Sequence, residues 1–453
     1  MLERKAIQTL LAWKNRENRQ TVLLIEGARR VGKSTLAQEF GKKHYKSVLT
    51  IDFSTVSEEF KALFLELRTD INALYQYLST LYRVPLFVGQ SLLIFDEVQC
   101  FPPARAFVKH IAADRRYDCI ETGSLLSIKQ NVEGILIPSE EESFRLNPLD
   151  FEEFLLAHND RMLCKVLAEH FAEMRPLPDA LHKRASRLFR EYMLIGGMPR
   201  VVDIFCQGRS FQEADFEKRQ ILDLYRKDVG RFAFGRQAKV RAILDEIPAQ
   251  LSTHEKRFKV SALTNNARMR DYEDAFFWLS DAQITNPCFA ADDPSIGLSL
   301  SRSKSSVKCY MSDTGLLSTL ALANRVITEE NLYQSLVSGS LSLNEGMLVE
   351  NIVAQTLQAL GDKLFFYSQT STQNGQQRME IDFLTVRPFS DANNKPRIVP
   401  IEVKSSTRYT TLSLDRFAAK FKSRVGNEIV LHPGQLRKEG RRLHVPLYMA
   451  HLL

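Results

Sequence analysis

The sequence predicts an α/β protein built from several domains, and two observations lead to this prediction. The runs at 22–25 and 91–95 are almost continuously apolar, as strands buried on both faces of a parallel sheet should be. The chain has 453 residues, more than one hydrophobic core usually organises, so roughly two to four domains are expected.

The composition is that of an ordinary soluble globular protein, with 44% hydrophobic and 25% charged residues. The net charge of +7 favours an anionic partner such as nucleic acid, although many mildly basic proteins never bind DNA. The six cysteines are scattered without a C-x-x-C pair, which predicts reduced thiols rather than a zinc site. With no signal peptide and no apolar run of membrane-spanning length, we expect a cytoplasmic protein without membrane contact.

The strongest motif lies directly after the apolar run 22–25, where residues 27–34 spell G-x-x-x-x-G-K-S ahead of a helical pattern. Its glycines let backbone N–H groups fold around a β-phosphate, Lys33 reaches the β- and γ-phosphates, and the Ser34 hydroxyl is placed to ligate Mg²⁺. A chance match in a glycine turn is the alternative, and the flanking strand and helix argue against it. The predicted ATP-binding residues are Gly27, Ala28, Arg29, Arg30, Val31, Gly32, Lys33, Ser34 and Thr35.

The second apolar run ends in two acids, Asp96 and Glu97. Asp96 at the carboxyl end of this strand would hold Mg²⁺, directly or through water, and Glu97 would orient and deprotonate the attacking water. Adjacent carboxylates at a strand end are costly unless a cation or solvent stabilises them, so a purely structural role is the weaker interpretation. The pair predicts hydrolysis of the bound nucleotide.

The next strand, 117–122, leads into Gly123 and Ser124. A small polar side chain at this strand end can contact the γ-phosphate or the lytic water, and Ser124 and Thr122 are the candidates. A glycine-serine turn without a catalytic role is the alternative.

These segments, with others further along, resemble the AAA-type ATPases of bacteria and archaea that carry an uncharacterised C-terminal domain. The matching motifs, in order over nearly the whole chain, are G-A-R-R-V-G-K-S-T (27–35), L-L-I-F-D-E-V-Q (92–99), E-T-G-S-L-L-S (121–127), N-P-L-D-F-E-E-F-L (147–155), Y-M-L-I-G-G-M-P-R-V-V (192–202), Y-M-S-D-T-G-L-L (310–317), E-G-M-L-V-E-N-I-V-A (345–354) and P-I-E-V-K-S-S (400–406). The first two motifs occur in many NTPases, and the later ones are more specific. The resemblance implies self-association into a ring with the nucleotide between subunits.

A ring of this kind uses an arginine finger on the neighbouring subunit's nucleotide. The candidates are Arg115, Arg116 and Arg145. A solvated surface arginine is the alternative for each of them. The acidic stretch 138–142 departs from the family's pattern and argues against Arg145.

Helical patterns dominate 151–247, and a Gly-Gly-Met-Pro turn at 196–199 interrupts them where the ATPase lid is expected to end. A later amphipathic helix, 238–247, is expected to stop at Pro248. A turn, a helix at 267–279 and short strands follow, which is the order of a winged helix, and the resembled family implies one here. Acidic residues on the second helix would repel phosphates, so packed helices without DNA contact are the alternative.

A second group of chemically active residues lies near the C-terminus. Glu350 falls in a helical pattern, Asp382 in an alternating strand, and Glu402 and Lys404 in the next strand, joined by a hairpin at 387–397. Glu402 and Lys404 project from one face of their strand because they are two residues apart.

This set suits Mg²⁺-dependent phosphodiester cleavage, with Asp382 and Glu402 as metal ligands and Lys404 placing the nucleophile or neutralising charge. The order Glu, Asp, Glu-x-Lys resembles the restriction-endonuclease-like core, including archaeal junction resolvases. The resemblance implies a C-terminal restriction-endonuclease-like α/β domain in which Glu350, Asp382, Glu402 and Lys404 are catalytic. A Glu402–Lys404 ion pair on an inactive nuclease scaffold is the alternative.

We therefore predict an AAA-type P-loop ATPase with a helical lid at 1–205, a helical and winged-helix-like region at 206–325, and a nuclease-like domain at 326–453. The leading hypothesis is ATP-driven remodelling, translocation or Holliday junction processing on duplex or branched DNA. The alternative is a nucleotide-gated regulatory switch whose C-terminal domain binds a protein partner, which the modest charge favours. A small-molecule kinase fits less well, because no second substrate motif is present.

Overall fold

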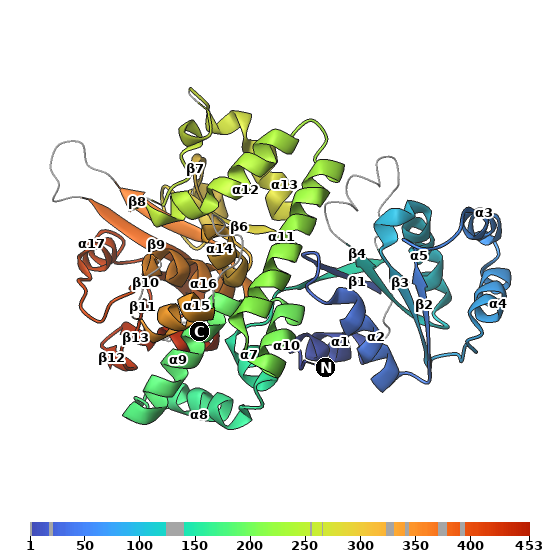
Figure 1. Ribbon diagram of the computed structural model, residues 1–453, viewed down its shortest axis with the longest axis horizontal. Coiled ribbons are helices and arrows are strands. Elements are labelled where there is room, and N and C mark those ends of the chain that lie inside the picture. Colours follow the sequence, from blue (N-terminus) through green and yellow to red (C-terminus); the bar gives the residue numbers. More distant parts are fainter. Residues whose placement is uncertain are drawn as a thin grey trace. The chain divides into compact units, whose positions relative to one another are not determined.

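The computed structural model describes residues 2–17, 21–123, 140–253, 256–264, 266–322, 330–339, 344–369, 378–389 and 395–453. It divides into two compact units, drawn in Figure 1. The N-terminal unit comprises Glu3–Asn147 with Asp281–Gln283, and the C-terminal unit comprises mainly Pro148–Ser280 and Ile284–Leu453. The borders predicted at 205/206 and 325/326 both fall inside the C-terminal unit. In the described ranges, no helix is both long and apolar enough to cross a membrane.

The N-terminal unit is a five-stranded parallel sheet with helices on both faces (Figure 1). Its strands are β1 (Val22–Gly27), β2 (Ser47–Asp52), β3 (Ser91–Asp96), β4 (Asp118–Gly123) and β5 (Glu141–Leu146). Its helices are α1 (Ala6–Lys14), α2 (Lys33–His44), α3 (Glu58–Leu67), α4 (Ile71–Tyr82), the 3₁₀ turn η1 (Val98–Cys100) and α5 (Pro102–Asp114). The order β2-β3-β4-β1-β5 inserts β4 between β1 and β3, so the ends of these three strands meet.

Two hydrophobic cores hold this sheet, one on each face. Successive side chains of a strand point to opposite faces, so Val22 and Leu24 pack with α3, α4 and α5, whereas Leu23 and Ile25 pack with α1 and α2. The run 92–95 of β3 has no exposed surface at all. The apolar runs are therefore confirmed as strands buried on both faces of a parallel sheet.

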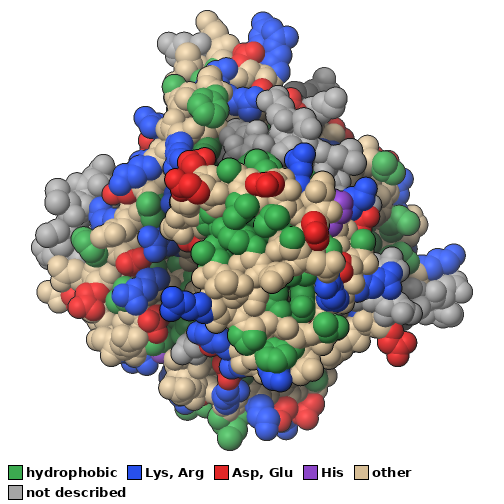
Figure 2. All heavy atoms as spheres, turned by 90° about the vertical axis from the view of Figure 1, so that its right-hand side faces the viewer, with side chains coloured by type: hydrophobic (Ala, Val, Ile, Leu, Met, Phe, Trp, Pro, Cys, Tyr) green, Lys and Arg blue, Asp and Glu red, His purple; other side chains and the backbone are tan. Residues whose placement is uncertain are grey.

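The N-terminal unit exposes several large apolar side chains. Leu65 of α3, Leu81 of α4 and Val88 are 37%, 50% and 64% exposed. Figure 2 shows hydrophobic side chains gathered near the centre of the face that it presents.

The C-terminal unit is built on an eight-stranded mixed sheet in the order β12-β13-β11-β10-β9-β8-β6-β7. Its strands are β6 (Thr285–Ala291), β7 (Arg302–Met311), β8 (Phe365–Gln369), β9 (Met379–Pro388), β10 (Pro396–Val403), β11 (Glu428–His432), β12 (Arg437–Glu439) and β13 (Arg442–Pro446). Its α-helices are α7 (Phe151–Ala157), α8 (Arg161–Ala172), α9 (Asp179–Ile195), α10 (Pro199–Gly208), α11 (Phe211–Phe232), α12 (Gln237–Ser252), α13 (Glu273–Asp281), α14 (Thr314–Ala321), α15 (Glu330–Ser338), α16 (Glu345–Ala359) and α17 (Leu412–Lys420). Its 3₁₀ turns are η2 (Val260–Ala262), η3 (Met269–Asp271), η4 (Leu298–Ser301) and η6 (Leu447–Leu452).

The hairpin predicted around 387–397 is present, because β9 and β10 pair antiparallel with Arg387 opposite Arg397. The winged-helix-like arrangement is not confirmed. Its hairpin, β6–β7, pairs through β6 with β8 and so belongs to the large sheet, with Phe289 next to Phe365. The predicted second helix, 267–279, consists of η3 followed by α13.

Helix α12 passes through Pro248 and ends at Ser252, whereas the sequence predicted that it stops at the proline. The last turn is retained by tertiary contacts. Leu251 is buried, and the Gln250 side chain accepts a hydrogen bond from the Lys259 amide at 2.9 Å. These contacts outweigh the backbone hydrogen bond that a proline inside a helix removes.

Three of the motifs that carry the family resemblance meet around one glycine. The Gly197 amide donates to the Asp313 carboxylate at 2.6 Å, and the Leu149 amide donates to the Gly197 carbonyl at 2.7 Å. A Cβ atom at position 197 would lie 2.1 Å from the Leu149 carbonyl oxygen. The motifs at 147–155, 192–202 and 310–317 therefore form a packing centre that only glycine permits.

We predict that Gly197→Ala lowers the free energy of unfolding by about 3 kcal/mol or more, because the added methyl group meets backbone that cannot move aside. Thermal and urea unfolding of the full chain measure this. Gly208→Ala is the matched control, since its Cβ would meet only the Glu213 side chain at 3.4 Å. Equal stability of both variants would contradict the packing argument.

The stability of the C-terminal unit should also depend on the protonation of His158. Burial, and then the charge of Arg209, lower the pKa of His158 to about 4. In the unfolded chain this pKa is about 6.5. Between pH 6.5 and 4, His158 is therefore mostly protonated in the unfolded state and mostly neutral in the folded state. Stability therefore falls as the pH drops through this window, and His158→Gln should reduce the fall. Unfolding midpoints at pH 7 and pH 5 test this, with His170→Gln on α8 as control.

Candidate functional site

The loop between β1 and α2 has the geometry of a phosphate-binding loop. Gly32 adopts a left-handed conformation (φ 95°) that glycine takes without a steric cost, and α2 begins at the next residue. The Lys33 ammonium is buried and donates to the carbonyls of Gly27 and Ala28 at 3.0 and 3.2 Å. Ser34 and Thr35 follow in the first turn of α2, so the helix N-terminus points its amides at the loop.

Asp96 lies at the carboxyl end of β3, and one of its carboxylate oxygens accepts hydrogen bonds from two neighbouring segments. Its Oδ1 accepts hydrogen bonds from the Ser34 hydroxyl at 2.7 Å, from the Glu97 amide at 3.1 Å and from the Thr122 hydroxyl. Of the two candidates at the end of β4, the structure brings Thr122 to the site, while Ser124 lies outside the described residues. Ser34, Asp96 and Thr122 thus converge where the strand ends meet.

Glu97 is held in a left-handed conformation with φ of 53°, which costs a non-glycine residue about 1–2 kcal/mol. The Gln99 side chain donates to its carboxylate. Sequence reasoning missed Gln99, although it stands two residues after Glu97 in the same motif. Backbone strain retained at a strand end, with a hydrogen bond that fixes the carboxylate, is typical of functional positions.

Two of the arginine-finger candidates make contacts inside the N-terminal unit. Arg116 pairs with Asp114 at 2.9 Å and stacks over the Tyr75 ring. Arg145 lies on β5 in register with Glu26, and burial lowers the pKa of its guanidinium. Arg145 is half-buried, and whether it acts as an arginine finger stays a prediction.

The structure also brings the C-terminal candidates together. The Val403 amide donates to Asp382 Oδ2 at 2.8 Å across the β9–β10 pair, and Lys404 Nζ lies 3.3 Å from Glu402 Oε2. Glu350 on α16 joins them through the ammonium of Lys308, which is 3.2 Å from Glu350 and 3.8 Å from Asp382.

The carboxyl groups of this cluster have different pKa values. Burial, and then the charge of Glu350, raise the pKa of Asp382 to about 6, and burial raises the pKa of Glu402 to about 7. Burial acts in the same direction on Glu350, but the charges of Lys308 and Lys256 outweigh it and lower its pKa to about 2. Glu350 therefore keeps its charge to a lower pH than Asp382 or Glu402 does.

Sequence reasoning missed three residues that contact Glu350. Lys308, Tyr310 and Lys256 all bind its carboxylate. The available signal was a lysine inside the apolar strand run 307–311, because a buried lysine needs an acidic partner. Nothing local pointed from Lys308 to an acid about forty residues further along the chain.

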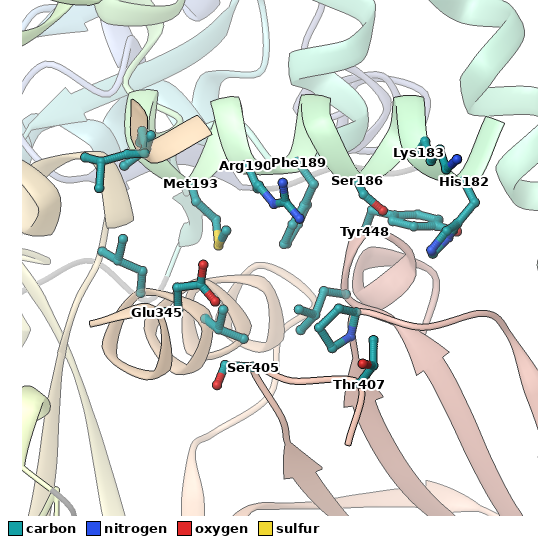
Figure 3. A pocket seen from close by; sticks show the side chains of 16 residues that line it. His182, Lys183, Ser186, Phe189, Arg190, Met193, Glu345, Ser405, Thr407 and Tyr448 are labelled. Atoms are coloured by element: carbon teal, nitrogen blue, oxygen red, sulfur yellow. The ribbon is translucent and has the colours of Figure 1, made fainter. Parts of the chain in front are cut away.

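A cavity of about 400 Å³ lies in the same unit, next to the residues that follow β10. Figure 3 shows His182, Lys183, Ser186 and Arg190 on α9 facing it from one side, with Ser405 and Thr407 on the other. Apolar side chains form part of its wall, namely Phe189, Met193, Leu194, Leu336, Leu348, Val349 and Leu447. The cavity therefore combines an apolar surface with cationic and hydroxyl groups and with the carboxylate of Glu345.

Comparison with family models accounts for most of the chain. Residues 19–155 match a model described as an AAA domain, 186–326 match a domain of unknown function (DUF8612), and 345–450 match another (DUF4143). The phosphate-binding loop, Asp96 and Glu97 all lie within the first match. The N-terminal unit matches an AAA domain over most of its length, and the chain is an ATPase. The two segments of unknown function share the eight-stranded sheet. Strands β6 and β7 belong to the segment 186–326, and strands β8 to β13 belong to the segment 345–450.

Three solved structures show weak similarity. The Walker-type ATPase PABY2304 of Pyrococcus abyssi is 14% identical, with a TM-score of 0.41 over 71% of this chain and 96% of that one. PCH-2 of C. elegans is 13% identical (TM-score 0.19; 36% and 46% covered), and the Drosophila ORC bound to DNA is 13% identical (TM-score 0.23; 70% and 94% covered). Similarities with TM-scores this low support no conclusion about the fold or the function of this chain. No curated protein sequence matches the chain.

The geometry of the AAA domain explains how it hydrolyses ATP. Lys33 and the α2 amides are placed where they would bind the phosphates, and we expect Glu97 to accept a proton from the attacking water. The Ser34 hydroxyl and the Asp96 carboxylate are oxygen ligands of the kind that Mg²⁺ prefers, so these two residues would hold the ion. When bound, the ion would neutralise charge on the phosphates.

We predict that Lys33→Ala abolishes nucleotide binding and that Glu97→Gln keeps binding but lowers the hydrolysis rate at least about 100-fold, as loss of a general base does. A fluorescent ATP analogue measures binding, and phosphate release measures turnover. Lys42→Ala, at the far end of α2, is the control and should behave as the unmodified chain. Hydrolysis by Glu97→Gln at the normal rate would remove Glu97 as the base.

Proposed function

We propose that this ATPase acts on DNA, and that the C-terminal unit binds duplex or branched DNA beside the β9–β10 hairpin. The observation that carries the proposal is the cavity of about 400 Å³ between α9 and the segment after β10. Its cationic and hydroxyl side chains are the groups that bind phosphate oxygens, and its apolar wall can pack against a base.

The surface around this cavity supports the proposal. The segment 404–408 reads K-S-S-T-R, and Arg408 is exposed. Tyr409, next to it, accepts a hydrogen bond from Arg437 of β12, which also pairs with Glu439 at 3.2 Å. A surface that joins several lysines and arginines to hydroxyl groups favours a phosphate backbone.

Self-association belongs to the proposal as well. The exposed apolar side chains Leu65, Leu81 and Val88 of the AAA domain support a contact between copies of the chain. Light scattering of the Glu97→Gln variant with and without ATP measures it. A single monomeric mass under both conditions would contradict self-association.

We predict that a four-way junction or a duplex raises the rate of ATP hydrolysis. The double variant Lys183→Glu/Arg408→Glu should weaken DNA binding about tenfold or more. It should also make the binding less dependent on salt. The slope of the logarithm of the affinity against the logarithm of the salt concentration should be smaller by about one for each phosphate group that the variant no longer binds. Fluorescence anisotropy measures the affinity at several salt concentrations.

The control is Lys42→Glu/Lys61→Glu, which makes the same change of charge on α2 and α3 of the AAA domain. It should retain the affinity for DNA. Absence of measurable DNA binding together with an ATPase rate that DNA leaves unchanged would overturn the proposal.

One observation favours the second candidate, a nucleotide-gated switch whose C-terminal unit binds a protein. Lys308 pairs with the acids of the predicted nuclease site, as expected of a nuclease-like scaffold that is used for binding alone. For this reason our proposal covers the binding and remodelling of DNA and leaves out its cleavage. A switch would hydrolyse ATP at a rate that is indifferent to DNA.

A further inference from the structure

The acidic cluster of the C-terminal unit already contains a cation, supplied by a strand outside the predicted nuclease-like segment. Lys308 lies on β7, and its side chain is 1% exposed. Its ammonium lies 3.0 Å from Glu380, 3.2 Å from Glu350 and 3.8 Å from Asp382. The side chain crosses the sheet over the ring of Phe366 on β8 to reach the acids of β9.

Further oxygens of the cluster contact donors from the chain, although Glu402 Oε2, which lies 3.3 Å from the Lys404 ammonium, has no hydrogen-bond partner among the described residues. Glu350 Oε1 accepts from Tyr310 as well as from Lys308, and Lys256 binds Oε2. Asp382 Oδ2 accepts from the backbone of β10, and Glu402 pairs with Lys404. Each carboxylate predicted to act in cleavage therefore already has a partner within the chain.

The charges nearly balance without a metal ion. In the described part of the chain, the ammonium groups of Lys256, Lys308 and Lys404 stand against the carboxyl groups of Glu350, Glu380, Asp382 and Glu402. Among the described residues, no three acidic, histidine or cysteine side chains are arranged to hold a metal. A divalent cation would have to enter beside a buried ammonium, which repels it at short range. The residues of this cluster do not fit Mg²⁺.

We propose that Lys308 is the resident cation of this cluster, so that the C-terminal unit folds around it, takes up no divalent metal there and does not cleave phosphodiesters. The cluster then serves to join β7, α16 and β9. Removing one partner of a buried ion pair strongly destabilises the folded protein, because the other charge is left buried without a partner. This inference holds whether or not the protein binds DNA.

Removal of the ammonium should create a metal site. We expect the nucleotide-free, full-length chain and its Asp382→Asn variant to bind Mn²⁺ equally, measured by electron paramagnetic resonance. Lys308→Met should gain Mn²⁺ binding at least tenfold tighter than that of the unmodified chain, and Lys308→Met/Asp382→Asn should lose the gain. Lys308→Arg, which keeps the charge, should gain none.

A Mn²⁺ site in the unmodified chain that Asp382→Asn removes would overturn the inference. So would Mg²⁺- or Mn²⁺-dependent cutting of plasmid or junction DNA that Asp382→Asn abolishes. If Lys308→Met fails to fold, as judged by circular dichroism and loss of ATPase activity, the comparison of the unmodified chain with Asp382→Asn still decides. DNA affinity, measured separately by anisotropy, tests the proposed function and leaves this inference unaffected.

Discussion

The C-terminal unit depends on one buried helix face that hydrogen-bonds three other elements. Glu350 on α16 binds β7, Asn351 binds the backbone of Met311 and the hydroxyl of Thr314, and Gln355 binds Thr314 and Tyr192 of α9. All three side chains are almost wholly buried, and a buried polar group left without a partner costs about 1–3 kcal/mol. The positions of β7, α14 and α9 are therefore fixed together.

The two acidic sites differ in what surrounds their carboxylates. Asp96 accepts hydrogen bonds from two hydroxyl groups and an amide, which are neutral and leave its negative charge available to a metal ion. The acids around Lys308 face ammonium groups, which cancel that charge. Residues of the same kind, predicted from sequence to do similar chemistry with Mg²⁺, thus have opposite electrostatic environments.

The parts that the sequence predicted correctly are encoded by residues close together in the chain. The loop at 27–34, the buried strands at 22–25 and 91–95, and the β9–β10 hairpin each follow from a local pattern of glycines or apolar residues. The pairing of Phe289 with Phe365, which joins β6 to β8, depends on residues far apart in sequence. The same holds for Lys308 and Glu350. A helix–turn–helix–hairpin order is compatible with a winged helix and with an extension of a neighbouring sheet, and only the long-range pairing distinguishes them.

The origin of Lys308 has a consequence for how this protein can be divided or recombined. The segment 345–450 matches a family model by itself, yet its buried acids are neutralised by side chains from 256 and 308, which lie before it in the chain. A fragment cut at 345 would keep the negative charges and lose two of the lysines that pair with them. The two segments of unknown function thus share one buried ion-pair cluster, and separating them would leave its acids without these two lysines.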